Sequence, residues 1–152
     1  TGITAHYIVE AIDEGNILFQ RKISLEGIKN DGELRYKLAN LAGEMIPELV
    51  NLFSNFEKPA GEPQDHTRST QAPKPVAEDG YLETAVTITE IQNRLRAYNP
   101  LPGTSILVNG QRIPVDHYEV LQGGAQEKPV KNEDFVAWTL DAQTIRLFKA
   151  VG

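Results

Sequence analysis

Two side chains near the start of the sequence have types and a spacing that suit proton transfer. His6 lies in a stretch rich in β-branched and aromatic residues, and Asp13 follows within an Asp-Glu-Gly sequence that is typical of a turn. If this turn folds back over the end of the preceding strand, the imidazole and the carboxylate share a pocket close to the apolar side chains of Ile8 and Ile12. Such a pair can take up and release a proton. The same residues also fit an ordinary turn and a half-buried strand residue, so the spacing alone leaves both interpretations open.

Motifs of several other kinds of site are missing from the sequence. The chain has three histidines and no cysteine, and no histidine falls in an HExxH or HxH pattern, so we expect no metal site. There is no G-x-S-x-G elbow, no Walker loop and no complete G-x-G-x-x-G. Triad hydrolases, NTPases and dinucleotide-binding enzymes therefore have no support.

The composition is that of a globular protein with an excess of acidic residues. The 152 residues suit one ordinary domain or two small ones, and the net charge of -6 disfavours a polyanionic partner held by bulk electrostatics. The apolar runs are far shorter than the ~20 residues that cross a bilayer, so we expect no membrane partner. No targeting segment is visible after Thr1, and the lack of cysteine suits a reducing compartment. We therefore expect a cytoplasmic protein.

The chain is predicted to consist of two parts joined by a proline-rich segment. Residues 57–79 contain four prolines and few other apolar side chains, which is typical of an extended connector. In the first part, residues 2–9 and 16–25 have the composition of strands.

A helix is predicted to complete this first part. Asn30 and Glu33 have the spacing of a capping box, and apolar side chains then recur every three or four positions over residues 34–52. Pro47 lies inside this pattern and predicts a kink there, or one helix that ends near Ile46 and a second that begins after it. The predicted order is thus strand, strand, helix.

The second part is predicted to contain one short helix and a hairpin directly after it. Thr87 has a glutamate three residues later, as in a capping box, and the helical pattern of residues 88–98 stops at an Asn-Pro pair. Residues 104–108 and 111–121 are predicted strands, because the Asn109-Gly110 pair between them favours a turn with two positive φ angles.

A second hairpin is predicted near the end of the chain. Residues 135–140 and 144–151 alternate between apolar and polar side chains on either side of a short turn. Pro114 in the first hairpin predicts an edge strand or a bulge. One helix with four short strands predicts a small antiparallel barrel, and the whole chain is assigned to the α+β class.

The segment around His6 and Asp13 resembles a motif of the folate-dependent formyltransferase family. The family motif consists of a strand, H-x6-D-x-G and an apolar strand, and here the spacing is kept with Gly15 in place. The resemblance implies that Asp13 handles protons while an amine attacks the formyl group of 10-formyltetrahydrofolate, with His6 as its neighbour. It also implies that the loop at the pterin consists of Val9, Glu10, Ala11 and Ile12.

The second part is similar to the methionyl-tRNA formyltransferases and the related sugar N-formyltransferases. Residues 72–74 resemble the A-x-K link between the domains of these enzymes, and residues 94–104 read R-L-R-A-Y-N-P-L-P-G-T, close to their R-A-x-N-P-x-P-G segment. The resemblance covers nearly the whole chain. It implies the C-terminal part of an α/β catalytic domain at 1–56, a linker at 57–79 and an OB-like domain at 80–152.

One half of the family's active site has no counterpart in the sequence. The family's N-terminal half contains an N-x-H-P-S segment, which supplies the catalytic Asn and His and most of the folate-site wall, and this sequence lacks it. Because the oxyanion-stabilising and proton-accepting groups must act together, we expect these 152 residues to be inactive alone. The parallel strands on which the first part would pack are also missing. The unpaired edge predicts a homodimer or a rearrangement through residues 1–8.

The resemblance implies that the amine that accepts the formyl group is methionyl-tRNA or an amino-sugar nucleotide. Contact with tRNA would need Lys and Arg along a groove, but residues 78–152 hold seven of them against ten Asp and Glu, which weakens tRNA as the substrate and leaves a small amine open. Trp138 and Phe148 are expected in the core rather than stacked on bases. Two alternatives remain open: a noncatalytic module that binds a ligand or partner, with Asp13 as a turn residue, and an RNA-binding barrel.

Overall fold

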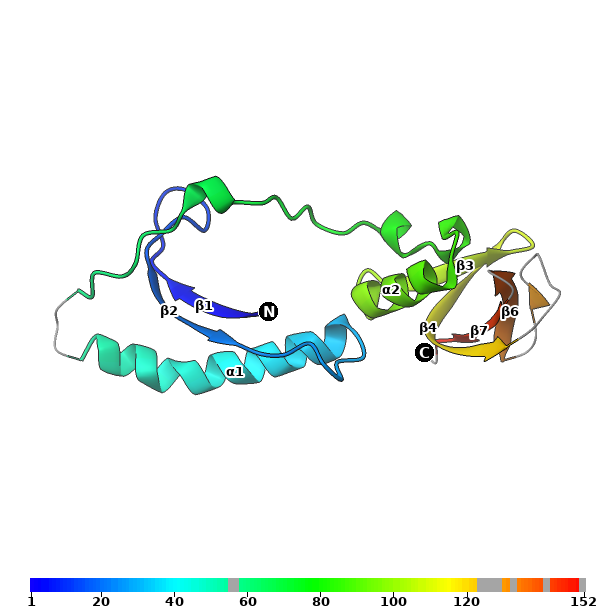
Figure 1. The fold of residues 1–152 in the computed structure, drawn as a ribbon, viewed down its shortest axis with the longest axis horizontal. Coiled ribbons are helices and arrows are strands. Elements are labelled where there is room, and N and C mark those ends of the chain that lie inside the picture. Colours follow the sequence, from blue (N-terminus) through cyan, green and yellow to red (C-terminus); the bar gives the residue numbers. More distant parts are fainter. Residues whose placement is uncertain (55–57, 123–129, 132–133, 141–142, 151–152) are drawn as a thin grey trace. The chain divides into compact units, whose positions relative to one another are not determined.

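The computed structural model describes residues 1–54, 58–122, 130–131, 134–140 and 143–150. They form two compact units, of which the first comprises Thr1–Ile28 and Glu33–Pro73 and the second Lys29–Gly32 and Lys74–Gly152 (Figure 1). The division after Pro73 falls inside the predicted linker, and the domain assignments 1–56 and 80–152 stay predictions. In the part of the chain that the structure describes, neither α-helix offers the long apolar stretch that a bilayer crossing needs.

The first unit contains the predicted pair of strands as an antiparallel hairpin. Strand β1 (Gly2–His6) pairs with β2 (Ile17–Lys22) from Gly2 opposite Lys22 to His6 opposite Ile17. Both strands are shorter than predicted: the chain leaves the ladder after His6 to form the loop that joins them, and β2 ends at Lys22, opposite the first residue of β1. Within the described residues, β1 has a partner along one edge only, and the predicted homodimer stays a prediction.

Helix α1 (Asp31–Leu52) follows the hairpin and runs through Pro47 as one element. The alternative of a second helix after Ile46 is therefore wrong. Pro47 has no N–H group to donate a hydrogen bond to the carbonyl of Gly43, one turn earlier. Because both residues are exposed, water can donate to that carbonyl instead. Met45 is buried on the opposite side of the helix.

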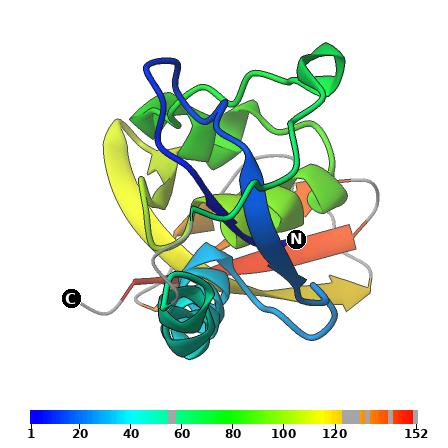
Figure 2. The same cartoon turned by 90° about the vertical axis from the view of Figure 1, so that its left-hand side faces the viewer.

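The second unit contains a five-stranded antiparallel sheet in the order β3-β4-β7-β6-β5. Its strands are β3 (Thr104–Val108), β4 (Gln111–Gln122), β5 (Val130–Lys131), β6 (Phe135–Leu140) and β7 (Gln143–Lys149). Both predicted hairpins are present, and β5 has too few residues to show a strand pattern in the sequence. The predicted turn residues 141–142 and Val151 lie outside the described residues. The sheet is curled (Figures 1 and 2), and its closure into an OB-like barrel stays a prediction.

Helix α2 (Ile88–Tyr98) and two 3₁₀ turns, η2 (Ala77–Gly80) and η3 (Leu82–Thr84), pack on this sheet. The core includes Trp138, as predicted, whereas Phe148 is half-buried and stacks on the ring of His117. The side chains that are completely buried are apolar and come from η3, α2 and four strands: Leu82, Ile91, Ile106, Val115, Val136, Ile145 and Leu147. This unit therefore has a hydrophobic core of its own.

The ends of α2 follow from local side-chain chemistry. At its start, the Thr87 hydroxyl accepts a hydrogen bond from Glu90 N (3.1 Å), and Glu90 Oε2 accepts one from Val86 N (3.0 Å). This is the predicted cap, with the glutamate bonded one residue earlier than in a standard capping box. At its end, Pro100 follows Asn99 and the helix stops as predicted.

Asn99 explains part of the R-A-x-N-P-x-P-G segment in structural terms. Its side chain is buried, its Oδ1 accepts a hydrogen bond from Thr104 N (3.2 Å), and its Nδ2 donates to Val115 O (3.4 Å). The Thr104 hydroxyl donates to the same Val115 carbonyl (2.6 Å). The peptide bonds before Pro100 and Pro102 are cis. The segment thus connects the end of α2 to β3 and β4.

The Asn-Gly turn of the first hairpin is confirmed, and the edge position of the following strand is wrong. Asn109 and Gly110 have φ angles of 50° and 78°, as a two-residue turn of this type requires. Strand β4 lies between β3 and β7 instead of at an edge. The irregularity in its register lies between Val115 and His117, close to Pro114.

Candidate functional site

The loop between β1 and β2 brings the two predicted site residues together. His6 lies at the end of β1, and its Nε2 is 3.7 Å from Oδ1 of Asp13. The side chain of His6 is 26% exposed, whereas that of Asp13 is 86% exposed. A half-buried imidazole therefore faces a carboxylate that is open to water.

The hydrogen bond on the other side of the imidazole determines its tautomer. Nδ1 of His6 lies 2.9 Å from the carbonyl oxygen of Tyr7. Because a carbonyl oxygen can only accept a hydrogen bond, Nδ1 must carry the hydrogen. In the neutral ring, Nε2 then has a free lone pair directed towards Asp13. Nε2 and Oδ1 of Asp13 are beyond hydrogen-bond distance at 3.7 Å, so the two groups are neighbours that could exchange a proton after a small movement.

The backbone at Asp13 has an unusual conformation. Its φ angle of 59° lies in the left-handed region, which residues other than glycine rarely adopt. Such a conformation costs free energy and persists only where the surroundings hold it. Two residues later, a Cβ atom on Gly15 would lie 1.8 Å from the carbonyl oxygen of Tyr7. Only glycine fits at this position, so steric hindrance explains why the H-x6-D-x-G pattern ends in glycine.

The apolar surroundings expected for Asp13 are not found. Ile8 and Ile12 are 95% and 89% exposed, because no described residue packs over this side of the loop. Val9, Glu10 and Ala11, the other residues of the predicted pterin loop, are exposed as well. The prediction of a shared apolar pocket is therefore wrong for the described residues, and the loop instead presents apolar side chains to solvent.

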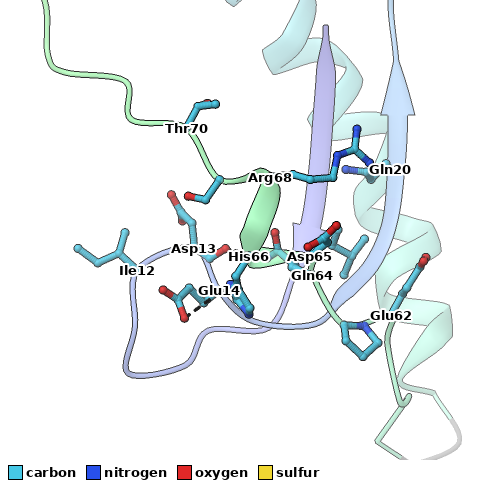
Figure 3. Close-up of a pocket in the computed structure, with 13 residues that line it drawn as sticks. Ile12, Asp13, Glu14, Gln20, Glu62, Gln64, Asp65, His66, Arg68 and Thr70 are labelled. Carbon is cyan, nitrogen blue, oxygen red and sulfur yellow. Dashed lines mark hydrogen bonds and ion pairs between the residues drawn. The ribbon is translucent and has the colours of Figure 1, made fainter.

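Asp13 lines an open polar pocket of about 840 Å³ on the first unit (Figure 3). The pocket lies between the loop, the start of β2 and residues 62–70. Glu14 and His66 face each other across it, with 3.9 Å between Oε2 and Nδ1, and would form an ion pair with the imidazole protonated; Arg68 supplies a guanidinium group. The remaining charged side chains that line it are carboxylates: Asp13, Glu62 and Asp65.

Asp65 is not suited to exchange protons near neutral pH. It begins the short 3₁₀ turn η1 (His66–Arg68), and its Oδ1 accepts hydrogen bonds from the hydroxyl (2.6 Å) and the backbone N–H (3.0 Å) of Thr67. These bonds, the hydroxyl first, hold the pKa of the Asp65 carboxyl below its ordinary value. Asp65 is therefore a fixed negative charge.

Residues 59–66, which we call the docked segment, hold the loop in place. They belong to the predicted linker, yet they lie along β2 and the loop. Ile17 and Glu62 exchange two backbone hydrogen bonds (2.8 and 2.7 Å). The Tyr7 hydroxyl donates to Pro59 O (2.6 Å), and Asn16 Nδ2 donates to Ala60 O (3.0 Å).

Gln64 is the residue of the docked segment closest to the candidate site. Its Nε2 donates to the carbonyl oxygens of Asp13 (2.7 Å) and Gly15 (2.8 Å). Sequence analysis missed it because these partners are 51 and 49 residues away. A proline-rich segment carries no periodic pattern that reports where it docks. The described residues contain no group of three or more His, Asp or Glu side chains that could hold a metal ion.

Several curated proteins are similar in sequence to this chain. The methionyl-tRNA formyltransferase of Thermotoga neapolitana is 32% identical over 113 residues, which are 74% of this chain and 36% of that protein. The methionyl-tRNA formyltransferase of Carboxydothermus hydrogenoformans is 34% identical over 115 residues, 76% of this chain and 37% of that protein. The chain thus spans little more than a third of the length of these relatives. No protein-family model matches it.

Two solved structures share the fold. A variant of HypX from Aquifex aeolicus matches 96% of this chain and 26% of its own, with a TM-score of 0.72 and 15% identity. The N-formyltransferase of Helicobacter canadensis, solved with folinic acid and dTDP-3-aminofucose, matches 98% of this chain and 55% of its own, with a TM-score of 0.68 and 16% identity. At these identities the likeness concerns the fold alone. The sequence relatives assign the chain to the formyltransferase family, as a member that corresponds to the C-terminal part of these proteins.

Proposed function

We propose that this chain is part of an enzyme that transfers a formyl group from 10-formyltetrahydrofolate to an amine. The observation that carries the proposal is the pair of His6 and Asp13, 3.7 Å apart, on a loop that the docked segment holds in a left-handed conformation at Asp13. Backbone strain that the surroundings maintain is typical of functional sites. The sequence relatives, which are formyltransferases, supply the reaction class.

The proposed task of Asp13 is to move a proton. 10-Formyltetrahydrofolate supplies the formyl group when it is bound. The amine must lose a proton as its nitrogen forms a bond to the formyl carbon, and the leaving nitrogen must gain one. The exposed carboxylate of Asp13 can accept the first proton, and the lone pair on Nε2 of His6 gives that proton a second place to reside.

The exposed loop before Asp13 fits the folate. Ile8 and Ile12 are almost fully exposed although they are apolar, and both lie close in the chain to the carboxylate. Covering them with a flat heterocycle would remove apolar surface from water, which is favourable. We therefore assign Val9, Glu10, Ala11 and Ile12 to the pterin side of the site.

These 152 residues are not proposed to catalyse the reaction alone. A developing oxyanion needs aligned donors, and in the resemblance these are an Asn and a His for which the chain has no N-x-H-P-S counterpart. The active protein therefore needs these groups from elsewhere.

A small amine is favoured over methionyl-tRNA as the acceptor. Three arginines of the second unit already form ion pairs: Arg94 with Glu90 at 2.6 Å, Arg112 with Glu83 at 2.7 Å and Arg146 with Glu119 at 3.8 Å. In each case a carboxylate already offsets the positive charge that would attract a phosphate. An amino sugar requires no such groove.

The experiment is a formyl-transfer assay on the native protein with 10-formyltetrahydrofolate. We expect formylation of an amino-sugar nucleotide and none of methionyl-tRNA. Formylation of methionyl-tRNA alone would contradict the choice of amine. If the protein transferred no formyl group and bound no folate, the noncatalytic binding module would replace the proposal.

A further inference from the structure

Gln64 uses the amide nitrogen of its side chain to hold the loop that carries Asp13. Nε2 lies 2.7 Å from the Asp13 carbonyl oxygen and 2.8 Å from the Gly15 carbonyl oxygen. A glutamine amide has two N–H groups, so the two bonds use both of its donors. The contact therefore needs a side chain that donates twice.

The two carbonyls that Gln64 binds belong to the two residues at which the backbone of the loop is most constrained. Asp13 has a φ angle of 59°, and Gly15 passes so close to Tyr7 that a Cβ atom would collide with it. Aspartate adopts this conformation more often than most residues do, but it still costs free energy, which contacts from neighbouring groups must offset. Rotation of the Asp13 backbone would also turn its side chain away from His6.

The rest of the docked segment stays attached without the Gln64 amide. Ile17 and Glu62 exchange two backbone hydrogen bonds, and Tyr7 and Asn16 each donate to a carbonyl of the segment. Loss of the amide should therefore release the Asp13 backbone and leave the unit folded.

We propose that Gln64 is a positioning residue for formyl transfer, which acts by holding the Asp13 backbone so that the carboxylate faces His6. This inference rests on the proposed function of Asp13. Gln64 belongs to the predicted linker and touches no reacting atom, but in this proposal it contributes to catalysis by positioning Asp13.

Gln64→Met tests the inference because methionine has a similar length and cannot donate. The matched control is Gln71→Met, which makes the same change at an exposed glutamine outside the pocket. In the native protein we expect kcat to fall about 10- to 100-fold in Gln64→Met, as for a small misplacement of a catalytic group, with KM for the folate within about twofold. Gln71→Met should keep the wild-type kcat.

A parallel measurement on Asp13→Asn separates the two ways in which the inference can fail. If Asp13→Asn abolishes turnover and Gln64→Met does not differ from Gln71→Met, Asp13 keeps its role and the positioning role of Gln64 is wrong. If Asp13→Asn transfers formyl groups like the wild type, the proposed role of Asp13 as the proton-handling carboxylate is wrong.

NMR tests the contact independently of activity. The coupling between the amide proton and Hα of Asp13, together with its carbon chemical shifts, reports the φ angle of this residue. We expect the values of a left-handed backbone in the wild type and in Gln71→Met. In Gln64→Met we expect these values to be lost. If Asp13 kept these values in Gln64→Met, the inference would be overturned whatever the kinetics.

Discussion

Single residues of the β1–β2 loop decide whether the candidate site can form. His6 presents a lone pair to Asp13 because its other nitrogen is occupied by a carbonyl. Asp13 has a left-handed backbone, its carbonyl and that of Gly15 both accept a hydrogen bond from Gln64, and Gly15 permits the close approach to Tyr7. The site therefore depends on backbone contacts as much as on the two ionisable groups.

Gly15→Ala should disrupt this loop. The added Cβ atom would lie 1.8 Å from Tyr7 O, a rigid backbone atom, so the loop must move, and we expect a loss of about 1–3 kcal/mol in the free energy of unfolding. Urea unfolding measures the change.

Gly43→Ala is the matched control for Gly15→Ala. Gly43 lies within α1 with nothing within 4 Å of an added Cβ atom, so alanine should stabilise the helix by about 0.5–1 kcal/mol. Equal effects of the two substitutions on the free energy of unfolding would refute the steric argument for Gly15.

The structural elements differ in how well they could be predicted from the sequence. The Thr87 cap of α2 and the Asn109-Gly110 turn depend on neighbouring residues, and both were predicted correctly. The docked segment depends on partners about 50 residues away, so no local pattern reports it. For the same reason the sequence indicated the pairing of His6 with Asp13 but not Gln64.

The N-terminal cap of α2 should make stability depend on pH. The hydrogen bond from Val86 N holds the pKa of the Glu90 carboxyl below its ordinary value of 4.5, and the ion pair with Arg94 acts in the same direction. The pKa of Glu90 is thus lower in the folded than in the unfolded protein. The carboxylate therefore stabilises the fold above pH 4.5, and this stabilisation is lost as the pH falls through the pKa of the folded protein.

Glu90→Gln tests this dependence. The difference in the free energy of unfolding between the wild type and the variant should be largest near neutral pH and should shrink below about pH 4.5. Urea unfolding across this range measures it, with Glu44→Gln at an exposed position of α1 as the control. A difference that stays constant with pH would show that the Glu90 charge contributes nothing.

The two units of the molecule differ in how much apolar surface they bury. Of the buried apolar side chains in the described residues, only Ile28 and Met45 belong to the first unit. In the same unit, the apolar residues Ile8, Ile12 and Val50 each have more than half of their surface exposed to solvent. This agrees with the proposal that the first unit works together with further protein. The chain as a whole matches little more than a third of the length of its relatives.

The most direct test of the account is the turnover of Asp13→Asn in the native protein. Asparagine has the same shape but cannot accept the proton, so we predict a fall in kcat of about 10²- to 10⁴-fold with an unchanged fold by circular dichroism. Glu44→Gln, the same chemical change on an exposed face of α1, should keep wild-type turnover. Wild-type turnover in Asp13→Asn would contradict the central claim that this carboxylate moves the proton during formyl transfer.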